Sequence, residues 1–430
     1  MVGLVMLLTL VALLALGVPV VFALGLAGLA GMLAIGPAAP MIIIPNSMMS
    51  GMDSFPLMAI PFFILAGELM NKGGITLRLV NFANVVIGGI RGGLAYANVM
   101  ASMLFAGITG SALADTAAIG RIMIPAMERQ GYDRPFSTAV TVSSSLIGPI
   151  IPPSITMVVY GVTAGVSIGG LFLGGIVPGL LVGFALMGLV GVMSHRRGYP
   201  KQEQPLTLGL FLRSLRDALV ALMMPLIILG GIFGGIMTPT EAAAIAVIYA
   251  LLVGFLVLRE LRLADLFPIF LRSALLTAAI LIIVGTARVA TDLLAQEQIP
   301  QQVAALLLSL TNEPWQVMLL INVFLLLIGT VIDTIAAIII TVPILLPIAL
   351  QIGLDPITFG VIVCVNLIIG LATPPLGICL FVASGVARLP VERLVQAMWP
   401  FLAVLVGVLL LITYVPGLVS FLPTHFGYIR

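Results

Sequence analysis

The sequence predicts an all-α polytopic membrane protein made of two inverted repeats. Three observations support this fold class: the composition, a duplicated set of interruptions in the apolar segments, and the placement of basic residues. Of the 430 residues, 61% are hydrophobic and 8% are charged, whereas soluble domains carry roughly 25% charged residues. A net charge of +2 gives no basis for a nucleic-acid partner. The lipid bilayer is therefore the expected environment.

The second observation is a two-part interruption that occurs once in each half of the chain. Residues 107–116 place glycines, hydroxyls and Asp115 inside an apolar stretch. Residues 148–154 then break the following helix, because each of their prolines removes a backbone donor and clashes with the preceding turn. The same features recur at Asp333, 218 positions after Asp115, and at Gly370, 222 positions after Gly148. Paired broken helices of this kind indicate the central binding site of a transporter.

The apolar segments divide into a first repeat (1–193), a polar linker (194–217) and a second repeat (218–430). In each repeat we expect five crossings and one re-entrant hairpin, because hairpin limbs of about 13 residues are shorter than the roughly 20 residues of a full crossing. The first repeat comprises spans at 1–16, 20–35, 56–70 and 167–193, an interfacial segment at 40–55, a surface arm at 76–90, a hairpin at 93–127 and a broken helix at 135–165. The second comprises spans at 218–235, 241–258, 268–289 and 394–415, an arm at 301–310, a hairpin at 315–350 and a broken helix at 355–387.

Basic residues give the third observation. The linker contains Arg196, Arg197, Lys201, Arg213 and Arg216 and is expected in the cytoplasm by the positive-inside rule. The outer segments 36–55 and 351–354 carry no basic residue, and only Arg288 and Arg430 fall near the outer side. Because five crossings is an odd number, the second repeat enters from the opposite side. Both termini are then periplasmic, the first hairpin opens to the cytoplasm and the second to the periplasm.

Asp115 and Asp333 have two interpretations. Each could cap the returning limb of its hairpin by accepting backbone N–H bonds, or each could help to hold a cation. The two roles are compatible. Hard cations take oxygen ligands from carboxylates, hydroxyls and carbonyls, and unwound carbonyls bind Na⁺ in transporters. Such oxygens are supplied by Thr109, Ser111, Thr330 and Thr373 and by the carbonyls around Gly148 and Gly370.

The half-helices that begin after each hairpin tip and each break present free N–H groups and positive dipole ends, which suit an anion. A carboxylate is the natural ligand. Thr116, Ser154 and Thr334 lie at these helix starts as donors, and Pro153 and Pro375 complete the candidate substrate-binding set. Arg121 could contact the anion or could reach the cytoplasmic surface by snorkelling. The sequence assigns no role to Glu68.

The sequence contains no recognisable catalytic or cofactor-binding motif, so we do not expect an enzyme or an organic cofactor. His195 and His425 are expected in solvated loops, and Cys364 and Cys379 as buried small hydrophobic residues rather than a disulfide or a metal site. No phosphate-binding GxxxxGK[ST] or zinc spacing is present. Two alternatives are an ion channel and an intramembrane aspartyl protease that uses the two aspartates. Such proteases resemble one another in a GxGD signature, which this chain lacks around Asp115 and Asp333.

Several long motifs resemble those of the large membrane (M) subunit of tripartite ATP-independent periplasmic (TRAP) transporters, and the resemblance covers essentially the whole chain. These motifs are Pro61-Phe-Phe-Ile-Leu-Ala-Gly-Glu-Leu-Met70, Arg91-Gly-Gly-Leu-Ala95, Ala101-Ser-Met-Leu-Phe-Ala-Gly-Ile-Thr-Gly-Ser-Ala-Leu-Ala-Asp115, Gly120-Arg121 with Ile124-Pro-Ala-Met127, and Ile151-Pro-Pro-Ser154. The resemblance implies a sodium-driven importer of an organic acid with an elevator-type ion-transporter fold, in a bacterial or archaeal cytoplasmic (inner) membrane.

The resemblance also implies partners and ligands. The partners are a small four-helix membrane (Q) subunit, expected as a separate chain because this chain starts at the first span, and a periplasmic substrate-binding (P) protein. Na⁺ is the expected coupling ion. Its implied ligands at the hairpin tips and helix breaks are Ser111, Asp115, Gly148, Pro149, Thr330, Asp333, Gly370 and Thr373. A self-sufficient sodium/carboxylate symporter of the same fold remains the alternative, and the transported carboxylate does not follow from the resemblance.

Overall fold

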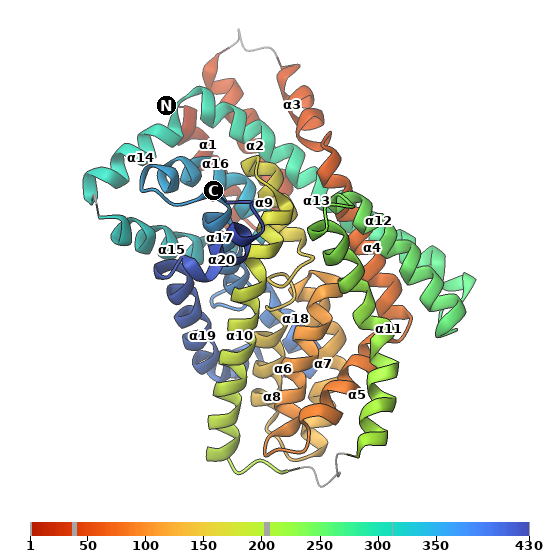
Figure 1. Cartoon of the computed structure of the whole chain (residues 1–430). Helices are drawn as coiled ribbons and strands as arrows, with labels where there is room; N and C mark the ends of the chain where they lie inside the picture. Colours follow the sequence, from red (N-terminus) through yellow and green to blue (C-terminus); the bar gives the residue numbers. More distant parts are fainter. Residues whose placement is uncertain (1, 37–40, 202–206, 312, 430) are drawn as a thin grey trace.

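The computed structural model describes residues 2–36, 41–201, 207–311 and 313–429, and within them the regular structure is helical, with one isolated bridge between Arg91 and Lys201. Pro40, five residues of the expected linker (202–206) and Arg430 lie outside the described part. The long helices form one elongated bundle (Figure 1). The end of α10 (Ile168–Arg196) and the start of α11 (Leu208–Phe233) lie at one end of this bundle, and both marked termini lie toward the other end.

The first half contains α1 (Val2–Ala15), α2 (Val20–Ile35), α3 (Ile43–Met52), the 3-10 turn η1 (Phe55–Met58), α4 (Ala59–Lys72), α5 (Ile75–Ile87), α6 (Gly93–Thr109), α7 (Ala112–Arg129), α8 (Arg134–Ser145), α9 (Ile155–Ala164) and α10 (Ile168–Arg196). The chain turns sharply between α6 and α7. Between α8 and α9 it is not helical over residues 146–154, which contain Gly148 and three prolines.

The second half contains α11 (Leu208–Phe233), α12 (Pro239–Leu252), the π-helical turn η2 (Val253–Val257), α13 (Leu263–Gln296), α14 (Ile299–Leu310), α15 (Pro314–Val331), α16 (Thr334–Gln351), α17 (Pro356–Gly370), α18 (Ile378–Ala387), α19 (Val391–Tyr414) and α20 (Gly417–His425). The α15–α16 turn and the α17–α18 interruption repeat the arrangement of the first half. Within the described residues, eight helical stretches are long and apolar enough to cross a membrane.

Four expectations from the sequence were wrong in detail. The limbs of the first hairpin are 17 and 18 residues long, not about 13, because the helices continue through Gly107 to the turn itself. The linker is helical from Leu208, since the Thr207 hydroxyl caps that helix by accepting the Leu210 N–H at 3.3 Å. The third span of the second half extends to 34 residues in α13. A further helix, α20, follows the last expected span.

The two histidines are also placed differently. His195 and His425 lie in the last turns of α10 and α20 rather than in loops, although both side chains are exposed as expected. Cys364 and Cys379 are buried free thiols, which confirms their role as small core residues.

Helices next to the hairpin tip of one half pack against helices next to the helix break of the other half. The second hairpin limb of the first half, α7, packs against α18, and the corresponding α16 packs against α9. Each hairpin also packs on the broken helix of its own half, α6 and α7 on α8, and α15 and α16 on α17. Both tips and both breaks are therefore held in one contiguous core.

Candidate functional site

The first hairpin tip lies directly on the first helix break. Gly110 ends α6 with a positive φ of 58°, and a Cβ at this position would lie 2.8 Å from the Pro153 carbonyl oxygen. Only glycine therefore allows both the turn and the close approach. Ser111 then caps α7 by accepting the Ala114 N–H at 3.4 Å. The tip thus places the start of α7 beside the unwound residues between α8 and α9.

Asp115 lies in the first turn of α7 and is fully buried. Its Oδ1 accepts a hydrogen bond from the Thr109 hydroxyl, while its Oδ2 has no hydrogen-bond partner among the described residues. This Oδ2 faces the break, because a Cβ built on Gly148 would lie 2.2 Å from it and 3.2 Å from the Ser145 carbonyl oxygen. A carboxylate with free acceptor capacity beside backbone oxygens is a fitting environment for a hard cation.

Two further predicted residues of this break bind each other. The Ser154 hydroxyl donates to the Pro149 carbonyl oxygen and accepts the Met157 N–H at 3.2 Å, so it caps α9. The Thr116 hydroxyl, one residue after Asp115, is buried and has no hydrogen-bond partner among the described residues. The Thr116 hydroxyl is consequently more available to a ligand than the Ser154 hydroxyl, which already makes two hydrogen bonds. Ser145, whose carbonyl lies at the break, was not predicted because its side chain gives no signal.

The second tip and break meet in a similar way. The Thr330 carbonyl accepts the Gly377 N–H at 3.2 Å, and Gly329 and Gly370 are in direct backbone contact, since a Cβ on Gly370 would lie 2.5 Å from the Gly329 carbonyl carbon. The hydroxyls of Thr330 and Thr373 donate to carbonyls of their own helices, at 2.7 and 2.8 Å. Their oxygens therefore keep lone pairs available as acceptors.

Asp333 differs from Asp115. Its Oδ1 accepts the Ile335 N–H at 2.9 Å and it stands at the N-cap of α16, so the capping interpretation applies to Asp333. In the first half the cap is Ser111 instead, which leaves Asp115 without a capping bond. Thr334 is buried and its hydroxyl has no partner among the described residues, whereas Pro375 is exposed and Pro153 is buried. Arg121 is exposed on α7, away from the buried tip residues.

A cavity of about 110 Å³ lies next to the first tip. It is lined by residues of α4, α6, α7, α9 and α13, namely Ile64, Gly67, Glu68, Asn71, Phe105, Thr109, Ser111, Ala114, Ile155, Leu276 and Ile280. Of the residues expected at the site, only Thr109 and Ser111 line it. Glu68 and Asn71 were missed as functional residues, because only the tertiary packing of α4 on the tip brings them there. In the sequence, Glu68 lies within the motif Pro61–Met70 and Asn71 directly follows it, but that motif supported only the family resemblance and assigned no role to either residue.

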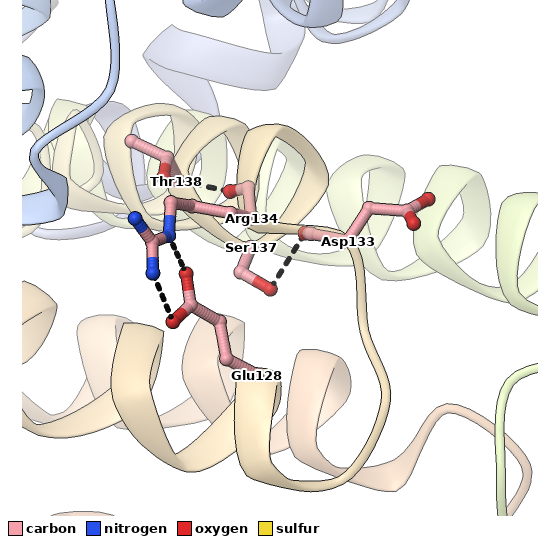
Figure 2. Close-up of polar contacts among 5 residues, drawn as sticks. All are labelled: Glu128, Asp133, Arg134, Ser137 and Thr138. Atoms are coloured by element: carbon pink, nitrogen blue, oxygen red, sulfur yellow. Dashed lines mark hydrogen bonds and ion pairs between the residues drawn. The ribbon is translucent and has the colours of Figure 1, made fainter.

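The ends of α7 and α8 away from the tip are tied together by polar contacts (Figure 2). The Arg134 guanidinium binds both carboxylate oxygens of Glu128, the second at 3.0 Å, and Ser137 and Thr138 donate to the carbonyls of Asp133 and Arg134. This turn fixes the second hairpin limb relative to the broken helix. No group of three or more His, Cys, Asp or Glu side chains suited to a metal ion occurs in the described part of the chain.

The helical fold with two paired hairpins and breaks defines a polytopic membrane transporter. Two solved structures share this fold: the YdaH transporter of Alcanivorax borkumensis, with a TM-score of 0.60 at 17% identity over 87% of each chain, and MtrF of Neisseria gonorrhoeae, with a TM-score of 0.51 at 14% identity over 87% of this chain and 84% of that one. At these identities the likeness concerns the fold alone.

The chain belongs to the family described as "Tripartite ATP-independent periplasmic transporter, DctM component", which matches residues 7–418. It is 42% identical to the C4-dicarboxylate TRAP transporter large permease protein DctM of Pseudomonas aeruginosa, over 87% of this chain and 88% of that protein. It is 41% identical to the sialic acid large permease protein SiaM of Vibrio cholerae, over 89% and 90%. A third relative, the isethionate permease DctMQ of Oleidesulfovibrio alaskensis, is 45% identical over 94% of this chain, which spans 64% of that protein.

These findings confirm the expected family. The relatives are transporter permeases and not enzymes, as the sequence predicted.

Proposed function

We propose that this chain is the transport subunit of a sodium-driven importer of an organic acid, and that it moves substrate by an elevator mechanism. The observation that carries the proposal is the Asp115 carboxylate, which is fully buried and whose Oδ2 faces the backbone of the first break at Gly148 without a hydrogen-bond donor in the described part of the chain. An uncompensated carboxylate in a membrane protein is costly. A bound cation would compensate it.

The proposed sodium ligands divide between the two halves. In the first half they are Asp115, Ser111 and the backbone at Gly148 and Pro149; in the second they are Asp333, Thr330, Thr373 and the backbone at Gly370. The first set fits a monovalent cation because it offers one carboxylate together with neutral oxygens. The cap at Asp333 leaves its Oδ2 for a ligand role. A cation bound at either place would join a tip to a break.

The substrate would bind where the starts of α7, α9 and α16 converge, with Thr116 and Thr334 supplying hydroxyl donors. The relatives carry names for isethionate, C4-dicarboxylate and sialic acid transport. These compounds are small organic anions, which favours helix starts and hydroxyls as the binding groups. We expect a carboxylate, in agreement with most of the relatives' names.

An elevator movement requires the tips and the breaks to move as one body. Buried polar bonds support this, since Asn98 of α6 donates to Thr141 of α8 at 2.7 Å and Asn366 of α17 donates to Asn322 of α15 at 2.8 Å. The direct contact of Gly329 with Gly370 has the same effect. Opening one hairpin alone would break buried bonds at a cost of about 1–3 kcal/mol for each unsatisfied group.

The experiment measures substrate uptake into proteoliposomes made with bacterial inner-membrane lipids. A sodium gradient, a matched proton gradient or no gradient is imposed. We expect uptake to need sodium, with a Hill coefficient above one, and to need the small membrane subunit and the cognate binding protein as well. Uptake driven equally by protons without sodium would refute the coupling. Robust uptake by this chain alone would refute the partner dependence and favour a self-sufficient symporter.

A further inference from the structure

We infer that the cavity between α4 and the first hairpin tip is a separate cation-binding site, in which the Glu68 carboxylate holds a hydrated monovalent cation beside the tip. The inference rests on the proposed sodium coupling and adds a site that the tips and breaks do not contain. Glu68 is the only charged residue among those that line the cavity. The cavity is therefore negatively charged and favours a cation over a carboxylate substrate.

Glu68 lacks a counter-charge for a structural reason. Its helical neighbour at i+4 is Lys72, a spacing at which Glu and Lys commonly pair. The Lys72 ammonium instead lies 3.1 Å from Asp265 at the start of α13. No ion pair involves Glu68 within the described residues, although its side chain is half-buried. An unpaired carboxylate in a transmembrane helix calls for a compensating ligand.

The other polar groups of the cavity have the chemistry of cation ligands. Asn71, Thr109 and Ser111 add amide and hydroxyl oxygens to the Glu68 carboxylate. A water occupies about 30 Å³ in the liquid, so the cavity of about 110 Å³ can hold an ion together with part of its hydration shell. The ligand set contains no imidazole or sulfur side chain that would favour a transition metal.

Thr109 connects this cavity to the buried aspartate. It lines the cavity, is 8% exposed, and its hydroxyl donates to Asp115 Oδ1. Thr109 lies close to α4 because Gly67 has no side chain: a Cβ there would lie 3.4 Å from the Thr109 Cα. Thr109 therefore contacts Asp115 and also lines the cavity that contains Glu68. We assign the cavity as the place where a cation waits before it reaches Asp115.

Among the residues that the structure describes, the second half has no equivalent of this cavity site. The repeat offset of 218 places Thr286 opposite Glu68, and the Thr286 hydroxyl is occupied by the Ile282 carbonyl at 2.9 Å. Gly285, the counterpart of Gly67, approaches the Met48 carbonyl of α3 and not the second tip. The site consequently exists only where the first tip lies against α4. The cavity site therefore depends on the packing of the first hairpin tip against α4.

The test is sodium titration of the purified full chain, with choline replacing sodium at constant ionic strength. Thermal stability and ²²Na⁺ binding are both measured. Glu68→Gln should raise the half-saturating sodium concentration about three- to tenfold, as expected for a charge that acts partly through water, and should leave the melting temperature in choline unchanged. Glu68→Asp should stay near wild type. Glu392→Gln, which neutralises an exposed glutamate in the first turn of α19, is the matched control and should match wild type.

The outcomes separate this site from the proposed function. If sodium stabilises the wild type and Glu68→Gln titrates like Glu392→Gln, the cavity site is refuted while sodium coupling stands. If sodium has no effect on the wild type relative to choline, sodium coupling itself is refuted, and the cavity site with it.

Discussion

Replacing Gly370 with alanine should destabilise the protein because the second tip and the second break touch through their backbones. A Cβ at this position would lie 2.5 Å from the carbonyl carbon of Gly329 and 2.7 Å from both its Cα and its oxygen. Backbone atoms cannot rotate away as a side chain can, so α15 and α17 must separate. Overpacking of this kind costs about 1–3 kcal/mol.

The assay is thermal unfolding of the purified protein in detergent. For a chain of this size we expect Gly370→Ala to lower the melting temperature by roughly 2 to 6 °C. Gly385→Ala in α18 is the matched control, because a Cβ there meets no atom within 4 Å. It should be neutral or slightly stabilising, since alanine is favoured over glycine inside helices by about 1 kcal/mol. Equal melting temperatures for the two variants would refute the contact on which the argument rests.

Three further predictions follow from other parts of the chain. Asp333→Asn should lose sodium-dependent stabilisation while the protein remains folded, because the amide oxygen still caps α16 but brings no charge; an unchanged sodium titration would contradict it. Burial raises the pKa of Tyr132 to about 12 from 10.0. The neutral phenol is thus favoured in the fold, and its contribution to stability is complete below about pH 10 and lost as the pH rises towards 12. Tyr132→Phe should flatten this alkaline loss in a melting-temperature series, and an identical profile would contradict the burial effect. Cysteines introduced at Lys201 and Gly427 should be labelled from opposite sides of the membrane, and labelling from the same side would refute the inverted repeat.

The interruptions could be predicted from the sequence because their causes are local. Glycine at φ > 0 and proline without an N–H act through their own backbone, so the turn at Gly110 and the non-helical stretch at 146–154 follow from residue type alone. The helix ends were harder to predict. Gly107 was taken as part of the tip, yet α6 continues through it because its missing side chain leaves room for Pro225, whose Cγ would lie 2.7 Å from a Cβ.

The length of α13 was also not predicted. The span expected at 268–289 contains Arg288 and leaves out Asp265, whereas α13 extends from Leu263 to Gln296 and includes both. Both charges have partners: Arg288 binds Asp292, four residues later on the same helix, at 3.0 Å, and Asp265 binds Lys72 of α4, a partner that the linear pattern does not reveal. A charged residue at a membrane surface therefore marks the depth of a helix and not its end.

The sequence predicted which residues lie at the candidate site but not the contacts that each of them makes. Asp115 and Asp333 were paired by their spacing, yet one is a buried acceptor with a free oxygen and the other is a helix cap. That difference depends on whether a serine precedes the helix, as Ser111 does before α7. The role proposed for Glu68 could not be predicted, because it depends on the neighbouring Lys72 pairing with Asp265, a residue far away in the sequence.

The crossed packing of the two halves gives the site a property that neither half has alone. Because α7 rests on α18 and α16 rests on α9, the half-helix that follows one break supports the hairpin of the other half. Gly120 of α7 lies against Val386 of α18, since a Cβ there would be 3.4 Å from the valine methyl. A cation that orders the first tip therefore also restrains the second break. Two sites that share a supporting element in this way are coupled through it, which is a physical basis for the sodium cooperativity that we propose.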